Sequence, residues 1–389
     1  MILHVACLPF PSPQGTQAAI DAMLRASAEE GQRADLLTYA HGAGEAPRPY
    51  TLHRLPDFPK VRSLRSGPSL GKVALDLRCI ATTRQLVSRL RPRAIVAHHI
   101  EAALACIAAR VRPLYYVAHT SLSRELPEYF RGLPFEVPSF AGRAAEQWAS
   151  AQVDGVGAVA PSLAAMLGDG ARYLPIPWST QGAAPSRAEA RRALGLPVDA
   201  KVCLYAGNLD RYQGWEELLP ALARLRRAEP AARLLIATES DPTPARAEAS
   251  RAGVADALSV CGLSGERARV LAHAAADLAW VPRRSEGGLP IKMLDAMARG
   301  VPIVAVERAA AGLPIDSSCE LVPNDDPDAM SRAAALLLES RKRADSLRRA
   351  SRAYLRAHHS PSAFALAMQA LLGEPSAARS HASAPNRAV

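Results

Sequence analysis

The chain has 389 residues, a formal net charge of +10 and 49% hydrophobic residues. This length exceeds one ordinary hydrophobic core, so we expect two domains of roughly 150 to 200 residues each. No apolar run approaches the ~20 residues of a membrane span, the N-terminus lacks the charged leader of a signal peptide, and the six scattered cysteines indicate neither a disulfide framework nor a zinc site, which together favour a cytoplasmic protein.

The first 40 residues predict a strand, a glycine loop, a helix and a second strand, which is how a parallel α/β domain opens. Gly15 and Thr16 lie at the junction of loop and helix, where such domains commonly face a ligand. A helix cap by Thr16 is the alternative interpretation. The junction is not G-x-G-x-x-G, which argues against a nicotinamide-binding domain and therefore against an oxidoreductase.

Residues 54–93 hold most of the excess positive charge, with ten basic side chains against two acidic ones. A helix is predicted over Lys72 to Leu90, with its arginines outward and an apolar face of Leu75, Leu77, Ile80, Leu86, Val87 and Leu90. A solvated helix face explains this pattern as well as contact with anionic membrane lipids does, at ~1 kcal/mol per cation near the surface. Nucleic acid is the weaker alternative, because no aromatic residues interleave with these arginines.

Two apolar segments that read as strands each end in histidine. RAIVAHH carries His98 and His99, and PLYYVAHT carries His119. The carboxyl ends of parallel strands point into the crevice where ligands bind, and histidine can donate to a phosphate or sugar oxygen near neutral pH. A histidine satisfied inside a loop is the alternative, and it is stronger for His98 and His99 than for His119.

Prolines at 175 and 177 interrupt the pattern, so we place the interdomain linker at about residues 173–184. A second α/β series then starts with a buried strand and the glycine turn GNLDRYQG, residues 207–214. A later strand is followed by the loop Gly262 to Ser264. The acidic run NDDPD contains D-x-D, but it opens a predicted helix, and helix capping explains it better than metal binding.

The most informative stretch is VPRRSEGGLPIKMLDAMARGVPIVAV, residues 281–306. It predicts a loop, a helix closed by Gly300, and a buried strand. A helix that starts behind a glycine loop presents unpaired N–H groups and a partial positive charge, which suit a phosphate or diphosphate. Asp295, about one turn into this helix, can accept hydrogen bonds from ribose or sugar hydroxyls.

This stretch resembles the donor-site signature of GT-B glycosyltransferases of the family 4 type, which has two glutamates separated by seven residues and then A-M-A-x-G-x-P. The second half is matched by Asp295, Ala296, Met297, Ala298, Gly300 and Pro302. The first glutamate would fall at Gly287, and the nearest glutamate is Glu286. Either Glu286 reaches the site through a different loop shape, or the first acidic role has been taken over or lost.

The resemblance implies an α/β protein of the GT-B fold class, with two Rossmann-like α/β domains facing across a cleft. The expected parts are an acceptor-side domain at 1–175, a donor-binding domain at 176–360, a C-terminal helix at 361–372 that packs back on the first domain, and a disordered tail at 373–389. The implied reaction transfers a sugar from a nucleotide diphosphate sugar to an acceptor hydroxyl with retention of configuration. No cofactor or metal is obligatory.

The resemblance also implies roles for single residues. His119 is expected at the transferred sugar, Asp295 at the ribose or donor hydroxyls, and Glu286 in the first acidic role. Arg211 and Lys292 are expected at the diphosphate, although Lys292 can also be read as an ion-pair partner of Asp295. The expected donor-binding residues are Gly15, Thr16, Gly207, Asn208, Arg211, Gln213, Gly262, Leu263, Gly287, Gly288, Leu289, Pro290 and Lys292.

The sequence departs from the family pattern at two places, the phosphate-binding turn and the first acidic position, and these departures allow an alternative function. In the turn GNLDRYQG, Asn208 and Gln213 stand where the family usually has cations, and Gly287 stands where it has a glutamate. The alternative is therefore a GT-B protein that binds a nucleotide sugar, or acts on it like an epimerase, without transferring it. The sequence does not choose the donor nucleotide, nor does it choose among a membrane lipid, a saccharide and a natural product as acceptor.

Overall fold

A computed structural model describes residues 1–12, 14–42, 48–56, 70–130, 132–180, 183–286 and 288–373, with the backbone alone for Leu70 to Val73. The chain divides into two compact units, each built on one parallel sheet. The first unit comprises Met1–Phe10, Leu24–Pro175 and the described part of Ser362–Val389, and the second comprises Pro11–Met23 and Ile176–Pro361.

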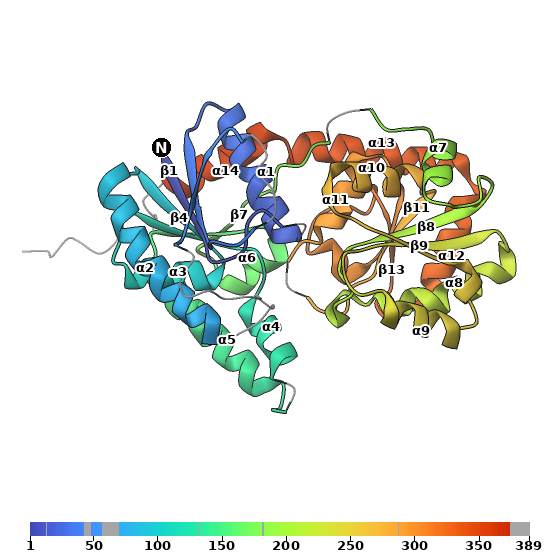
Figure 1. Cartoon of the computed structure of the whole chain (residues 1–389), viewed down its shortest axis with the longest axis horizontal. Helices are drawn as coiled ribbons and strands as arrows, with labels where there is room; N and C mark the ends of the chain where they lie inside the picture. The colour runs from blue at the N-terminus through green and yellow to red at the C-terminus, as the bar shows by residue number, and fades with distance from the viewer. Residues whose placement is uncertain are drawn as a thin grey trace, which may run out of the picture. The chain divides into compact units, whose positions relative to one another are not determined.

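The described residues of the first unit form a seven-stranded parallel sheet in the order β3-β2-β1-β4-β5-β6-β7 (Figure 1). Its strands are β1 (Ile2–Ala6), β2 (Ala34–Thr38), β3 (Thr51–Arg54), β4 (Ala94–His98), β5 (Leu114–Ala118), β6 (Gly155–Ala158) and β7 (Ala171–Tyr173). β1, β2, β4 and β5 are buried along their whole length. Continuous burial of this kind is expected for parallel strands, because helices cover both faces of the sheet.

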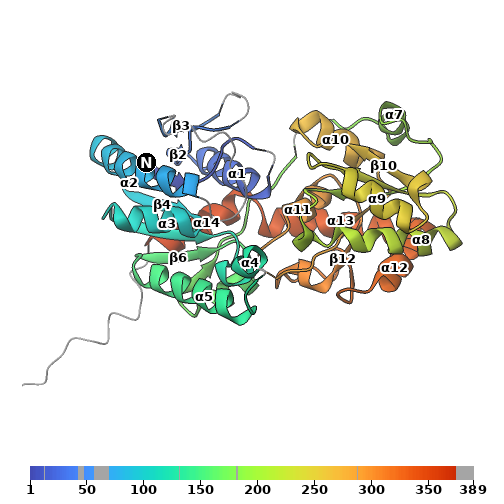
Figure 2. The same ribbon diagram turned by 60° about the horizontal axis from the view of Figure 1, so that its bottom comes forward.

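The helices of the first unit are α2 (Leu70–Leu90), α3 (His99–Ala108), α4 (Leu122–Tyr129), α5 (Glu136–Ala151), α6 (Pro161–Leu167) and α14 (Pro361–Gly373). Helix α1 (Gly15–Glu29) is divided between the units, because its residues up to Met23 belong to the second unit. The three connections β3 to β4, β4 to β5 and β5 to β6 all run in the same direction across the sheet. Right-handed crossovers therefore place α2, α3 and α5 on one face, where α3 contacts both of the others (Figure 2). α14 packs on β5 and β6, where Tyr115 donates to the carbonyl oxygen of Leu372 at 3.1 Å.

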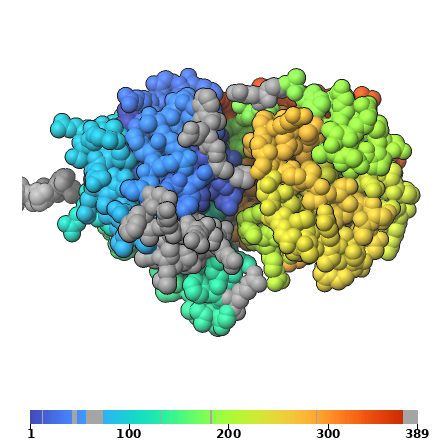
Figure 3. Space-filling view, viewed as in Figure 1, coloured from blue at the N-terminus to red at the C-terminus, as the bar shows by residue number. Residues whose placement is uncertain are grey.

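The described residues of the second unit form a six-stranded parallel sheet in the order β10-β9-β8-β11-β12-β13. Its strands are β8 (Lys201–Ala206), β9 (Ala232–Ala237), β10 (Leu258–Cys261), β11 (Leu278–Val281), β12 (Ile303–Val306) and β13 (Glu320–Val322). Its helices are α7 (Arg187–Ala193), α8 (Leu218–Ala228), α9 (Thr243–Arg251), α10 (Gly265–Ala275), α11 (Ile291–Ala298), α12 (Pro327–Glu339) and α13 (Arg341–His358). Figure 3 shows α9 and α10, in yellow to orange, at the surface of this unit.

Two parallel-sheet α/β domains are therefore confirmed, as are several local predictions. Gly300 follows α11 with a φ of +69°, a left-handed conformation that favours glycine. The carboxylate of Asp326 accepts from the N–H of Ala329 at 2.9 Å, so capping accounts for the acidic run at the start of α12. No helix of the described residues is both long and apolar enough to cross a membrane.

Other predictions need correction or fall outside the described residues. Leu77 was assigned to the buried face of the basic helix but is 64% exposed, whereas Leu75 and Leu86 are buried as expected. Gly373 is the last residue of α14, so it belongs to a helix rather than to the tail. Residues 57–69 of the basic segment and 374–389 of the tail lie outside the described residues.

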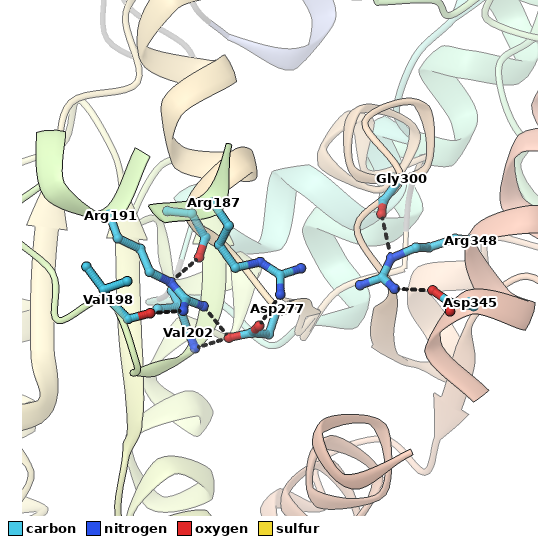
Figure 4. Close-up of polar contacts among 9 residues, drawn as sticks. Arg187, Arg191, Val198, Val202, Asp277, Gly300, Asp345 and Arg348 are labelled. Atoms are coloured by element: carbon cyan, nitrogen blue, oxygen red, sulfur yellow. Dashed lines mark hydrogen bonds and ion pairs between the residues drawn. The ribbon is translucent and has the colours of Figure 1, made fainter. Parts of the chain in front are cut away.

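A buried ion pair fastens the start of the second sheet (Figure 4). Arg191 of α7 is 5% exposed, and its Nη2 lies 2.6 Å from Oδ2 of Asp277. Its other nitrogens donate to the carbonyl oxygens of Ala275 and Val198, and Asp277 also accepts from the N–H of Val202. The pair therefore joins α7, the end of α10 and the first residues of β8.

Replacing Arg191 with leucine is expected to lower the free energy of unfolding by about 3 kcal/mol, because two buried carbonyl groups lose their donor and Asp277 keeps only the half-exposed Arg187 as a cation. Urea unfolding followed by circular dichroism measures the change. Arg224 pairs with Asp328 at the surface, so Arg224→Leu is the matched control and should cost less than about 1 kcal/mol. Equal losses in the two variants would contradict the expectation.

Candidate functional site

The second unit has a topological switch point between β8 and β11. Successive connections from β8 and from β11 run in opposite directions across the sheet, and ligands of open α/β sheets bind at the carboxyl ends of strands at such a point. Gly207 follows β8 with a φ of +149°, and Gly288 precedes α11 with a φ of +119°. No described side chain caps α11 at Pro290, so its first N–H groups remain open to a ligand.

Lys292 of α11 projects its ammonium group towards the glycine turn. Its Nζ donates to Oε1 of Gln213 at 2.9 Å and lies 4.1 Å from the centre of the Tyr205 ring. A Cβ atom built on Gly207 would lie only 2.9 Å from the same Nζ, so a larger residue there would displace this ammonium group. Burial, and then the positive charge of Arg283, lower the pKa of Lys292 well below its usual range.

The alternative interpretation of Lys292 as the ion-pair partner of Asp295 is wrong. Among the described residues no carboxylate lies within ion-pair distance of Lys292, whereas Asp295 pairs with Arg299. Gln213, which stands where the family usually has a lysine, instead accepts a hydrogen bond from Lys292. The ammonium group of Lys292 therefore lies within hydrogen-bond distance of the position where the family usually has a lysine.

The other cations of the turn differ in their environment. Arg211 is exposed on the 3₁₀ turn η1 (Arg211–Gln213), and the buried guanidinium of Arg283 lies 5.4 Å from the centre of the Tyr212 ring. Arg284 pairs with Glu217 at 2.7 Å, and this pair is part-buried. We therefore place Arg283, rather than Arg284, beside Lys292 as the second cation near the turn.

The turn itself is held by internal hydrogen bonds. Asn208 donates through Nδ2 to Asp210 at 2.7 Å, and its carbonyl oxygen accepts from the hydroxyl of Tyr205 at 2.5 Å. Trp215 donates to the carbonyl oxygen of Leu209 at 2.7 Å. Asn208 therefore shapes the turn by local bonding and supplies no charge.

Asp295 is 6% exposed and lies in a polar cluster that the sequence did not predict. Its Oδ1 accepts from Nε of Arg299 at 3.0 Å and from the indole N–H of Trp178 at 3.4 Å. Nε2 of His273 lies 3.8 Å from Oδ2. The spacing of four residues between Asp295 and Arg299 was the available signal for the pair, but nothing in the sequence indicated Trp178 or His273.

The loop after β10 is held by a carboxylate from the segment that follows the neighbouring strand β9. Oε1 of Glu239 accepts from the N–H groups of Leu263 at 2.6 Å and of Ser264 at 2.7 Å. A Cβ atom on Gly262 would lie 3.2 Å from the same oxygen, which explains the glycine. Gly262 and Leu263 therefore form a rigid loop at the carboxyl end of the sheet. Glu239 was missed because its partners are backbone groups.

The remaining predicted residues lie at the two helix starts. Gly15 opens α1, and a Cβ atom there would lie 3.3 Å from Cγ1 of Ile291 at the start of α11. Thr16 is the second residue of α1, so its interpretation as the cap is wrong. Leu289 is buried and Glu286 is exposed. Gly287 lies outside the described residues.

The first unit contains a chain of three hydrogen-bonded histidines on adjacent strands. Nδ1 of His4 on β1 lies 2.9 Å from Nε2 of His98, the last residue of β4. Nδ1 of His98 lies 2.9 Å from Nε2 of His119, which follows β5, and the ring of His99 stacks on His119. His4 and His98 are fully buried and His119 is 4% exposed.

Burial lowers the pKa of His4 to about 4. Burial, followed by neighbouring histidines, lowers the pKa values of His98 and His119 well below their usual range. All three rings are therefore neutral at pH 7. Both ring nitrogens of His98 are hydrogen-bonded, but His98 is the last residue of strand β4 and does not lie in a loop, as the alternative interpretation had it.

Two family models match the chain. Residues 13–177 match Glycosyltransferase Family 4, and residues 200–340 match Glycosyl transferases group 1. Among curated proteins, the D-inositol 3-phosphate glycosyltransferase of Segniliparus rotundus is 32% identical over 177 residues, which are 43% of this chain and 39% of that protein. The protein of the same name from Saccharomonospora viridis is 33% identical over 38% of each chain. These matches span less than half of the relatives' length.

Solved structures resemble nearly the whole chain. Sucrose-phosphate synthase from Thermosynechococcus elongatus has a TM-score of 0.76 at 18% identity, with 95% of this chain and 98% of that chain covered. Anabaena HepE in complex with UDP and glucose has a TM-score of 0.74 at 16% identity, with 95% and 99% covered. At these identities the likeness shows the fold. Together with the two family models, it shows that the chain belongs to the GT-B glycosyltransferases of the family 4 type.

Proposed function

We propose that the protein transfers a sugar from a nucleotide diphosphate sugar to an acceptor hydroxyl, with retention of configuration. The observation that carries this proposal is the placement of Lys292. A partly buried ammonium without a carboxylate partner among the described residues, set between a glycine turn and an open helix N-terminus, suits a diphosphate. Such preorganised charge stabilises the diphosphate as it leaves the sugar.

The donor that we propose to test first is a uridine diphosphate hexose. HepE has been solved with UDP-glucose, and its chain matches the fold of this protein over 95% of the length. The loop at Gly262 and Leu263, which Glu239 holds rigid, is the proposed border of the base. Its backbone groups can bind a base without dictating which one, so a panel of nucleotides is needed.

We propose that the Nδ1–H group of His119 donates a hydrogen bond to the transferred sugar. Three neutral rings in a chain can order their protons in two ways. In the first order, the proton of His4 is on Nδ1, and Nε2 carries only an unshared electron pair. In the second order, the proton of His4 is on Nε2, which is then a buried N–H group without a hydrogen-bond partner. An orphaned buried donor is the rarer and costlier state. The favoured order leaves the proton of His119 on Nδ1, as a donor.

Asp295 is the proposed partner of the ribose or donor hydroxyls. Replacing it with asparagine is expected to weaken donor binding by about tenfold or more, because hydrogen bonds to a charged group contribute about 1.5 to 3 kcal/mol. Arg299→Met breaks the same ion pair and is the matched control for indirect effects. Calorimetric titration with UDP-glucose measures both. If Asp295→Asn and Arg299→Met bind the donor equally, Asp295 has a structural role alone.

Transfer itself is tested by incubating the protein with the bound donor and candidate acceptors, and by detecting the glycoside by mass spectrometry. A cyclitol phosphate is a natural first acceptor, because the curated relatives are named for inositol 3-phosphate. The alternative function, a nucleotide-sugar binder that does not transfer, is favoured by the glycine at position 287 in place of a glutamate. Donor binding without any glycoside would support that alternative.

We also propose an anionic lipid surface as partner of the basic segment 54–93, with attachment at the inner face of the membrane. In its described part Arg78, Arg89, Arg91 and Arg93 are exposed. Arg84 has another role, because it donates to the carbonyl oxygens of Ala108 and Ala109 and so ties α2 to α3. Exposed arginines near a bilayer contribute about 1 kcal/mol each.

A further inference from the structure

Helix α5 carries apolar side chains on the side that faces solvent, whereas a surface helix ordinarily directs its apolar side towards the core. Its buried side carries Pro138, Gly142, Glu146 and Ala149. Its exposed side carries an uninterrupted apolar stripe, at the three- and four-residue spacing of one helix face, of Val137, Phe140, Ala141, Ala144, Trp148 and Ala151. Phe140 is 74% exposed and Trp148 is 52% exposed, so these side chains have no cover within the described residues.

The stripe continues into the segment between α4 and α5. Seven of the thirteen large hydrophobic side chains that are exposed in the described residues fall within residues 129–148. We call these seven the apolar surface: Tyr129, Phe130, Leu133, Phe135, Val137, Phe140 and Trp148. Scattered single apolar residues are normal on a protein surface, but such a concentration marks an interaction site.

The neighbours of the apolar surface indicate what covers it. α5 lies beside α3, and α3 lies beside α2, all on one face of the first sheet. α2 exposes Arg78 and Arg89 together with Leu77, and α3 exposes Leu104. This helix layer thus presents aromatic residues at one edge and cations at the other. The combination is typical of helices that lie in a membrane interface, with aromatic rings at the head groups and Arg on anionic lipid.

A second copy of the chain fits this face less well. Most dimers are two-fold symmetric and bring the same face of both subunits together, so the arginines of α2 on the two copies would share one interface. An anionic bilayer, in contrast, complements both the cations and the apolar side chains.

We propose that the apolar surface inserts shallowly into an anionic lipid bilayer, with the arginines of α2 on the head groups. The inference rests on the lipid partner proposed above and names the element that enters the membrane, but it does not depend on sugar transfer. The membrane would then hold the first unit, which is the proposed acceptor side, at the surface where a lipid acceptor lies.

The first test is sedimentation with vesicles of phosphatidylcholine, with and without phosphatidylglycerol. The double variant Phe140→Ser/Trp148→Gln is expected to bind the anionic vesicles at least tenfold more weakly than the wild type. Leu366→Gln is the matched control, because Leu366 is 68% exposed on α14, and it should bind as the wild type does. Unchanged binding of the double variant would overturn the proposal, and loss in Arg78→Gln/Arg89→Gln alone would make the contact purely electrostatic.

Trp148 supplies a second readout, since it is 52% exposed, whereas Trp215 and Trp280 are buried and Trp178 is half-buried against Asp295 in the second unit. Brominated lipids should quench the fluorescence of the wild type on vesicles, and Trp148→Phe should abolish most of this quenching. If the protein binds no vesicles and sediments as a dimer that Phe140→Ser/Trp148→Gln dissociates, a second copy covers the apolar surface and the proposal is wrong. Stabilisation by UDP, measured in every variant, reports separately on the donor site.

Discussion

Replacing Lys292 with methionine is expected to weaken nucleotide diphosphate binding by roughly thirtyfold or more. Removing one partner of a buried charge pair costs about 2 to 5 kcal/mol, and the ammonium group of Lys292 is the cation enclosed at the glycine turn. Methionine keeps most of the length and apolar character of the lysine stem. Calorimetric titration with UDP measures the change, and Lys342→Met on the exposed side of α13 is the control for the loss of one positive charge.

A second substitution makes this test sharper. Gln213 accepts a hydrogen bond from Lys292 and stands where the family usually has a lysine. The double variant Lys292→Met/Gln213→Lys moves the cation back to that place and should recover a large part of the affinity. Full affinity in Lys292→Met alone would mean that the diphosphate binds elsewhere.

The protein is also expected to take up protons from the solvent when it binds the donor. Burial and Arg283 lower the pKa of Lys292 in the free protein, and a bound diphosphate raises it again. Between these two pKa values the complex binds more protons than the separate molecules, so affinity falls as the pH rises through that window. Titrations in buffers of different ionisation enthalpy count the protons, and Lys292→Met should remove this uptake.

His119→Ala is expected to lower turnover by about a hundredfold or more while UDP binding stays within about threefold. Loss of one preorganised hydrogen-bond donor at the reacting group typically costs about 10² to 10³ in rate. The result would separate the role of His119 from that of the donor site in the second unit. Equal loss of turnover and of UDP affinity would contradict it.

The histidine chain predicts that His4 positions His119 through His98. His4→Leu removes the outer ring, whereas His4→Asn keeps an N–H group near the place of Nδ1, so the asparagine variant should retain more turnover. Histidine ¹H–¹⁵N spectra report the tautomer directly, and His119 should be protonated at Nδ1 in the wild type. Because the pKa of His4 is lowered to about 4, its contribution to stability is complete above pH 6.5 and is lost as the pH falls towards 4.

Most strands and helices of both sheets could be predicted from the sequence, because buried parallel strands are continuous apolar runs and glycines mark the turns between them. Gly300 and the helix after NDDPD are examples in which local chemistry was sufficient. The prediction that Leu77 lies on the apolar face of its helix was wrong, because an apolar residue at a helical spacing need not face the core. Local patterns report what a residue prefers, but not which surface covers it.

Which side chains meet at the candidate site depends on the order of the strands in each sheet, and local sequence patterns do not predict that order. His4, His98 and His119 are neighbours because β1, β4 and β5 are adjacent in the sheet. Likewise, Lys292 meets Gln213 because β8 and β11 are adjacent at the switch point. The sequence therefore suggested Lys292 as a cation for the diphosphate, but could not show that its ammonium group contacts Gln213.

Thermal unfolding across a panel of nucleoside diphosphates and nucleotide sugars tests the donor site of the second unit most directly. A ligand at a hundred times its dissociation constant stabilises the folded state by about 2.7 kcal/mol. We predict stabilisation by the diphosphates and sugars of one base, retained in Lys342→Met and lost in Lys292→Met. Absence of stabilisation by every nucleotide in the wild type would contradict the assignment of a nucleotide-sugar donor to this protein.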